Sequence, residues 1–335
     1  MHVKTRWALA VAGVVAAMAA GIGSYFLAAG DETPVIHPSA SASPSPSPSV
    51  PKKTDTQRRN PLTGIGPGGH VLAVKIDNVG PAQDQQAGLN SADLVYVIQV
   101  EGGLSRYLAI FDSSHAPDEV GPVRSARQTD IPLLAAYGRI GLAYSGAIPG
   151  LLPELAVANL QNITPDIAPD QFTNGGSSPT YIDPRKIFAA YRHLALTKYV
   201  GFQFGAMPAG GRPDKSVTVD MPAAVFTFTA KGTEWLVSVD GSPSITINQG
   251  PTTTDNIIVQ HVNVVPGQFT DHNAAQPANE VFSETTGSGT AYFYRDGRVW
   301  RGRWSKPTKT SATAYTVNGK PMELAPGRTW IVLEG

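Results

Sequence analysis

The sequence predicts an α/β domain with a mixed sheet and helices, followed by a β-rich domain. Two observations predict this class: strand-like and helix-like segments alternate through residues 61–205, and strand-like runs separated by turn residues fill 216–335. A charge-free apolar stretch and a Pro/Ser-rich stretch precede them. We therefore divide the chain into a signal-anchor or signal peptide (1–30), a disordered linker (31–60) and the two folded domains, separated at the glycine-rich segment Gly205–Pro213. The alternative is that the C-terminal runs return to complete a sheet with the first domain.

Composition excludes several classes of function. The chain of 335 residues has 26 basic and 26 acidic side chains, so its net charge is zero and nothing favours a nucleic-acid partner. It has no cysteine, which excludes disulfides, a cysteine nucleophile, thiolate metal sites and a lipid-modified cysteine.

The N-terminal apolar segment predicts a membrane partner. Trp7–Ala29 carries no charge and is long enough for one membrane span, which needs ~20 apolar residues. Lys4 and Arg6 precede it, so the N-terminus is expected inside and the folded domains outside. The alternative is a cleaved signal peptide, with Ala17-Met18-Ala19 as the cleavage motif and a secreted product.

The linker consists mainly of small polar residues and proline. Ser39–Pro51 has little apolar surface to bury, so it is expected to stay disordered. Alternating proline favours extended backbone, which would hold the folded part away from the membrane.

The first folded domain contains three apolar runs that predict buried strands: Val71–Ile76, Leu94–Val100 and Tyr107–Phe111. Gly141–Ser145 is a fourth candidate strand. The predicted helices are Ile131–Tyr137, Leu151–Val157 and Pro184–Leu194, the last with Asp183 as its N-cap and proline in its first turn.

The second folded domain is expected to be built from strands alone. Its strand-like runs are Val217–Val219, Val225–Thr229, Leu236–Val239, Ile245–Ile247 and Ile257–Val265. Asp240-Gly241, Asp296-Gly297 and Asn318-Gly319 are turn signals, the last two typical of two-residue hairpins. Trp300, Trp304 and Trp330 are expected in the core rather than on a sugar-binding surface.

The candidate binding site is the segment between the second predicted strand and residue 130. Glu101 precedes two glycines and Arg106 follows them, while Arg124 and Arg127 lie three residues apart. Guanidinium groups suit carboxylate and phosphate, and a helical turn would place Arg124 and Arg127 on one face. These side chains either bind an anion or form a structural network with Glu101.

Asp77 and Asn78 complete the candidate site, because they follow the first strand. Polar groups at strand ends line ligand crevices in α/β folds, although an Asx turn explains them equally well.

The sequence predicts no cofactor and no metal. The histidines, His115 among them, show no metal-binding spacing, and Tyr144-Ser145-Gly146 lacks the glycine that a nucleophile elbow requires.

Four motifs resemble the YerB-like family of exported bacterial proteins, a domain of unknown function. They are Ile76-Asp77-Asn78, Gly88–Asp93, Glu101–Arg106 and Val120–Arg127. The resemblance covers Asn60 to the C-terminus and implies an extracytoplasmic, envelope-associated role without an established chemistry. This chain departs from the family where the lipid-bearing cysteine is replaced by an apolar anchor, and at Ser177–Tyr181, where a histidine is missing.

These observations leave three hypotheses. The first is a membrane-tethered envelope protein that binds a cell-wall polymer or an envelope protein through the Arg/Glu site. The second is a hydrolase or transferase acting on wall glycan or an anionic polymer, with Asp77 or Glu101 as general acid or base. The third is a structural domain without a ligand. Burial distinguishes them, because a scaffold buries its charges as pairs and an enzyme exposes a carboxylate in a cleft.

Overall fold

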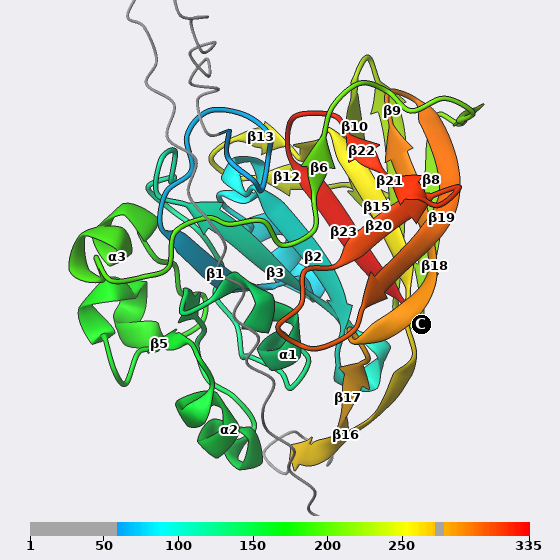
Figure 1. Ribbon diagram of the computed structural model, residues 1–335. Coiled ribbons are helices and arrows are strands. Elements are labelled where there is room, and N and C mark those ends of the chain that lie inside the picture. The colour runs from blue at the N-terminus through cyan, green and yellow to red at the C-terminus, as the bar shows by residue number, and fades with distance from the viewer. Residues whose placement is uncertain (1–58, 272–277) are drawn as a thin grey trace, which may run out of the picture. The chain divides into compact units, whose positions relative to one another are not determined.

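The computed structural model describes residues 59–271 and 278–335 (Figure 1). The predicted span Trp7–Ala29 and the linker segment Ser39–Pro51 lie outside the described residues. Within the described part, no helix is long and apolar enough to cross a membrane. The fold is mixed α/β and rich in strands, with a C-terminal region dominated by sheet, as the sequence predicts.

One large mixed sheet runs through the molecule and takes strands from both predicted domains. In spatial order its strands are β21 (Lys320–Pro321), β20 (Ala314–Val317), β19 (Arg298–Lys306), β18 (Gly287–Arg295), β15 (Asn256–His261), β23 (Thr329–Glu334), β2 (Leu94–Gln99), β3 (Ser105–Asp112), β1 (Val71–Asp77), β4 (Gly141–Ala143) and β5 (Gln161–Ile163), with β7 (Arg212–Pro213) beside β19.

The first three predicted strands are confirmed as β1, β2 and β3. β3 pairs antiparallel with both others, and β4 lies parallel to β1. Every residue of β3 is buried, as expected for a strand covered on both faces. Because β1 and β3 are antiparallel, the end of β1 and the start of β3 meet at one edge, and Asp77 faces Arg106 there.

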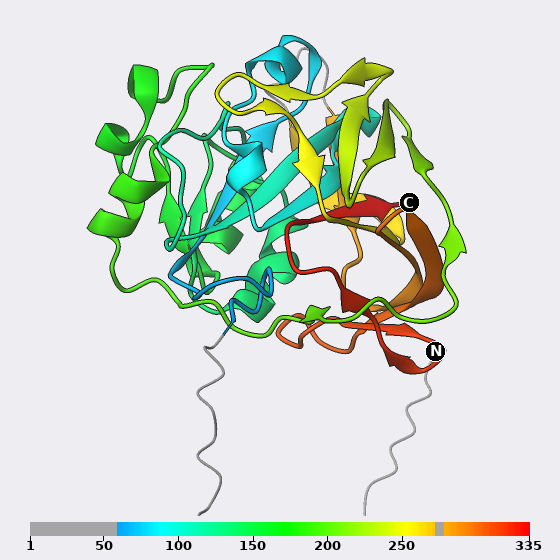
Figure 2. The same ribbon diagram turned by 90° about the horizontal axis from the view of Figure 1, so that it is seen from above.

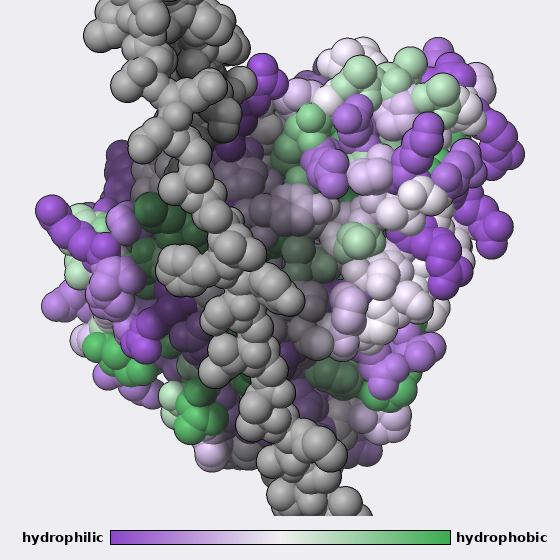
Figure 3. Space-filling view, in the orientation of Figure 1, coloured by the Kyte–Doolittle hydropathy of each residue, from purple (hydrophilic) through white to green (hydrophobic). Residues whose placement is uncertain are grey.

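The helices lie beside the first-domain strands (Figure 1). They are α1 (Asp130–Leu134), which continues as a 3-10 turn to Tyr137, α2 (Leu152–Val157) and α3 (Pro184–Ala190). Asp183 caps α3 by accepting a hydrogen bond from the Arg185 amide, as predicted. Figure 3 shows hydrophobic surface near α2, where Val157 is largely exposed.

A second, smaller sheet covers one face of the large one (Figure 2). It contains β8 (Ser216–Met221), β9 (Ala224–Lys231), β10 (Glu234–Val239), β11 (Ser242–Pro243) and β14 (Thr253–Thr254). Exposed and buried residues alternate along β8, so one of its faces meets water. On the opposite face of the small sheet, Phe226 and Phe228 of β9 pack against Tyr107 and Trp330 of the large sheet.

Three pairs of short or separate strands complete the fold: β12 (Ile245–Thr246) with β13 (Gly250–Pro251), β16 (Val264–Asp271) with β17 (Ala278–Ser283), and β6 (Gln203–Phe204) with β22 (Glu323–Leu324). The predicted single run Ile257–Val265 is wrong, since β15 ends at His261 and β16 leaves the large sheet. The predicted turns Asp240-Gly241, Asp296-Gly297 and Asn318-Gly319 are confirmed, each with positive φ at both residues.

The C-terminal strand β23 joins the two halves of the chain. It lies parallel between β2 of the first half and β15 of the second. Trp330 on β23 is buried and contacts Tyr107 of β3 with ring centroids 5.1 Å apart, and Trp300 and Trp304 are buried as predicted. Strands from either side of the predicted boundary therefore share one hydrophobic core.

Candidate functional site

The predicted site residues gather at the edge where β1 ends and β3 begins. The segment around Arg124 runs beside this edge: its amide donates to the Lys75 carbonyl of β1, and its carbonyl accepts from the Ser145 amide just after β4. Since β1 and β4 are parallel, Arg124 spans their two carboxyl ends, the position at which α/β sheets bind ligands.

Glu101 and Arg127 form a two-point ion pair. Arg127 Nε donates to Glu101 Oε2 at 2.7 Å, and Nη2 contacts Oε1. Both side chains are largely buried. Burial opposes ionisation, but hydrogen bonds from Arg127 and the charges of Arg127 and Arg106 outweigh it and lower the pKa of Glu101 to about 2. Glu101 is therefore a fixed anion at neutral pH.

Arg106 is buried beside this pair with a less complete set of partners. Its Nη1 donates to the Ser125 carbonyl at 3.2 Å, and Nη2 lies 3.7 Å from Glu101 Oε1. Its Nε has no hydrogen-bond partner among the described residues. Burial and the neighbouring Arg127 lower the pKa of Arg106 to about 10.

Arg124 is the exposed member of the group. Its side chain is 42% exposed, and its Nε lies 3.0 Å from Asp77 Oδ2. The segment from Gly121 to Gln128 is not helical, so the expected shared face of Arg124 and Arg127 is wrong. Arg124 instead faces Asp77, while Arg127 turns to Glu101.

Asn78 has an internal role. Its amide donates to Ser105 Oγ at 2.8 Å, and its carbonyl oxygen accepts from Gln86 at 3.0 Å. All three side chains are buried, so Asn78 ties the end of β1 to the start of β3 rather than facing solvent.

The structure adds three charged residues that the sequence did not single out. Lys75 and Asp130 form a fully buried ion pair at 2.7 Å, and Glu280 of β17 accepts the Gln128 amide at 2.6 Å. Lys75 was hidden inside an apolar run, and Glu280 is distant in sequence. We call the resulting group the arginine cluster; its cations are Lys75, Arg106, Arg124 and Arg127, and its acids are Asp77, Glu101, Asp130 and Glu280.

The arginine cluster is closer to neutral than the sequence indicated, with four acids for four cations. Burial raises the pKa of Glu280 to about 7, so this acid is partly protonated near neutral pH. Burial also lowers the pKa of Lys75, which acts in the opposite direction, so the cluster as a whole is close to neutral.

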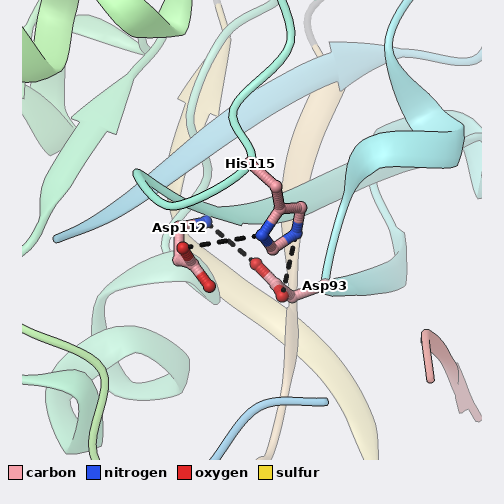
Figure 4. Close-up of side chains that lie close together, drawn as sticks. All are labelled: Asp93, Asp112 and His115. Carbon is pink, nitrogen blue, oxygen red and sulfur yellow. Dashed lines mark hydrogen bonds and ion pairs between the residues drawn. The ribbon is translucent and has the colours of Figure 1, made fainter. Parts of the chain in front are cut away.

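A second charged group lies at the other end of β3 (Figure 4). His115 Nε2 lies 3.4 Å from Asp93 Oδ1, and Nδ1 lies 3.6 Å from Asp112 Oδ1. Both aspartates are completely buried, whereas the histidine side chain is 46% exposed. We call these three residues the acid–histidine group. In the sequence, Asp112 lies near His115. Asp93 lies further away, after a different turn, so the sequence did not indicate that it contacts His115.

Hydrogen bonds from the Asn60 side chain and from two backbone amides hold the aspartates of the acid–histidine group in place. Asn60 donates its amide to both aspartates, the Asp112 amide donates to Asp93 Oδ2, and the Ser114 amide donates to Asp112 Oδ1. His115 donates a hydrogen bond to Asp93, and this bond together with the negative charge of Asp93 raises the pKa of His115. One ligand atom from each member lies within 4.8 Å of the others, so these are the described side chains that could converge on a metal ion.

A pocket of about 410 Å³ borders the acid–histidine group. Its wall brings together the loop after Asn60, the turns at Asn90 and Ser114, and the segments around Asp255 and Arg328. These segments come from both halves of the chain, so the pocket exists only in the assembled fold.

The chain belongs to the DUF3048 family of proteins of unknown function. The N-terminal domain of this family matches residues 62–197 and the C-terminal domain matches 217–331. A Bacillus subtilis (strain 168) protein named "Putative lipoprotein YerB" is 36% identical over 107 residues, which span 30% of this chain and 31% of the relative. The crystal structure of the YerB protein from Bacillus subtilis is similar over 82% of this chain and 95% of that one, with a TM-score of 0.66 and 22% identity, which shows a common fold.

Proposed function

We propose that this protein is a membrane-tethered envelope protein that binds an anionic group of a cell-wall polymer or an envelope protein. Arg124, at the carboxyl ends of β1 and β4, would hold the anion. The observation that carries this proposal is the difference in exposure between the arginines: Arg106 and Arg127 are buried, and Arg124 reaches solvent.

The surrounding charges support Arg124 as the contact residue. Arg124 Nε is buried against Asp77 Oδ2, whereas the side chain as a whole is 42% exposed. Within the described residues Nη1 and Nη2 of Arg124 donate no hydrogen bond, so an anion with two oxygens could take both. Partial protonation of Glu280 would reduce the negative charge near that anion.

Glu101 does not support the alternative of a wall hydrolase or transferase. Both of its oxygens contact Arg127, and its pKa of about 2 keeps it ionised at neutral pH. A general acid needs a pKa near the working pH. The buried pair of Glu101 and Arg127 fits a structural network, so we assign anion binding to the exposed side chain of Arg124 alone.

The N-terminal sequence and the name of the relative support the proposed cellular location. The relative carries the word lipoprotein in its name, which favours an envelope location for this chain. This chain has no cysteine to carry a lipid, so Trp7–Ala29 is the segment that we propose as its anchor. Protease added to intact spheroplasts should remove residues 61–335, and their protection in cells whose exported control is digested would contradict the orientation.

The binding test compares Arg124→Ala with Arg139→Ala in the full-length chain. Arg139 also lies on the surface, where it donates to Gln161. We expect Arg124→Ala to reduce retention on isolated cell-wall polymer or on a captured envelope partner at least tenfold, with an unchanged melting temperature. Arg139→Ala should behave as the wild type.

Thermal unfolding of the same samples separates binding from structure. A large fall in the melting temperature of Arg124→Ala with normal retention would contradict the proposal and leave a structural ion pair. Retention should also fall with rising salt, because an exposed guanidinium is screened.

A further inference from the structure

We propose that the pocket beside the acid–histidine group binds a ligand carrying an alkylammonium group, and that Asp255 receives its charge. This site is separate from Arg124 and takes a ligand of the opposite sign. The argument rests on the shape of the pocket, on the balance of charge in its walls and on one carboxylate oxygen with spare capacity.

The pocket has the size and lining of a small-ligand site. Its volume of about 410 Å³ falls in the range of ~300–1,000 Å³ that such sites occupy. Ile65 and Pro67 form an aliphatic wall, and Ile65 is 57% exposed. Ser91, Ser114 and Asp255 supply polar groups around it. An alkyl chain would cover Ile65 and leave its polar end at the rim.

At one end of the pocket, a single guanidinium serves two carboxylates. Arg328 Nη2 donates to Glu234 Oε1 at 3.0 Å, while Nε lies 3.8 Å from Asp255 Oδ2. The other donors of Arg328 go to Asn90 and Thr253, which carry no charge. Within the described residues, two carboxylates therefore share one guanidinium here, and Glu234 is 46% exposed to solvent.

Asp255 is the carboxylate with an unused oxygen. Its Oδ2 accepts the Arg328 amide at 2.7 Å, and in the described part of the chain Oδ1 has no donor. Burial raises the pKa of Asp255, and the nearby Glu234 adds to the effect. An ammonium group at Oδ1 would supply the missing donor and the missing charge.

His115, which lines the pocket, contacts two buried acids that do not line it, Asp93 and Asp112. Burial raises the pKa of Asp93, which reduces the negative charge that this pair carries. Asp255 is the carboxylate that lines the pocket itself, and it favours a cation there over an anion.

A metal ion is the weaker explanation for this charge. Each oxygen of Asp93 and of Asp112 already accepts a hydrogen bond, from Asn60 or from a backbone amide. A metal ion would have to share these oxygens with their present donors. Asp255 Oδ1 accepts no hydrogen bond within the described residues, and a monovalent ammonium needs one contact there.

The experiment measures binding of n-pentylamine to the purified full-length chain by calorimetry, with 1-pentanol as the neutral probe of the same length. We expect pentylammonium to bind at least tenfold more tightly than 1-pentanol. Asp255→Asn should remove that preference while keeping the acceptor for the Arg328 amide. Asp118→Asn, which changes an exposed acid outside the pocket, should leave binding unchanged.

A second variant keeps the test decisive if Asp255→Asn fails to fold. Ile65→Arg places a tethered cation at the exposed wall and should block pentylammonium without affecting the core. Equal binding of amine and alcohol, or normal amine binding by Ile65→Arg, would overturn the proposal. Competition by Mn²⁺ that depends on Asp93 and not on Asp255 would overturn it as well. Arg124→Ala should leave amine binding intact, so this site and the proposed anion site fail independently.

Discussion

The arginine cluster and the acid–histidine group lie at opposite ends of β3, and they neutralise buried acids in different ways. The arginine cluster surrounds its acids mainly with arginine, which stays protonated well above neutral pH, and with Lys75, whose pKa burial lowers. The acid–histidine group relies on one histidine, which titrates near neutrality. The difference predicts opposite responses to pH: the first group loses stability in acid and the second loses it in base.

The largest expected effect comes from the buried pair of Lys75 and Asp130. Lys75→Met removes the cationic partner of Asp130 in a site with no exposure, and removal of one partner of such a pair costs about 3–5 kcal/mol. Urea unfolding at pH 7 measures this loss. Arg185→Ala, at an exposed ion pair, is the control and should show no resolvable change. A Lys75→Met protein as stable as wild type would mean that the cluster tolerates an unpaired acid.

The next effect concerns Glu101 and acid. Its folded pKa of about 2 lies below the ordinary value of 4.5, so its contribution is complete above pH 4.5 and is lost as pH falls toward 2. Arg127→Gln should cost about 2 kcal/mol at pH 7, allowing for solvent near Glu101. It should also flatten the stability profile between pH 4.5 and 2. Arg127→Lys, which keeps the charge, should restore part of the slope.

Asn60 tests how far neutral donors support the acid–histidine group. Its amide serves Asp93 and Asp112 together, so Asn60→Ala leaves two buried acceptors short of a donor. We expect a loss of about 1–2 kcal/mol, measured by chemical unfolding. Asn263→Ala, which removes an exposed side-chain hydrogen bond to Glu284, is the matched control. Equal losses in the two variants would show that the acids find other donors.

The smallest expected effect, that of His115, tests the difference between the two charged groups most directly. The pKa of His115 is raised in the folded state, so its stabilisation is present below pH 6.5 and disappears as pH rises through the folded value. His115→Gln should therefore lose up to about 1 kcal/mol at pH 6 and match the wild type at pH 9. Stability curves at several pH values test this. A deficit that grows with pH would contradict the role of the imidazolium.

Local patterns predicted most of the secondary structure. Val71–Ile76, Leu94–Val100 and Tyr107–Phe111 form strands because continuous apolar runs suit a sheet covered on both faces. Asp240-Gly241 and Asn318-Gly319 turn as expected because both positions adopt positive φ. The place of β23 in the large sheet was not predictable, since no local signal specifies which strands pair.

The sequence predicted which residues lie together at the site better than it predicted their geometry. The sequence placed Glu101, Arg106 and Arg127 together, and the structure brings them into contact. It could not show that Arg124 pairs with Asp77, because that depends on an extended path after Gly121. Lys75, Asp93 and Glu280 were missed because buried charges look like ordinary strand, turn or hairpin residues until the fold assembles.

The central position of β23 sets the order in which this protein becomes complete. A ribosome makes β2 early and β23 near the end of the described chain, yet β23 must lie between β2 and β15. Until it arrives, both neighbours present unpaired backbone groups, which are prone to pair with other chains. The large sheet therefore cannot close before Thr329–Glu334 has been made, and we expect a nascent chain stalled before Thr329 to bind chaperones.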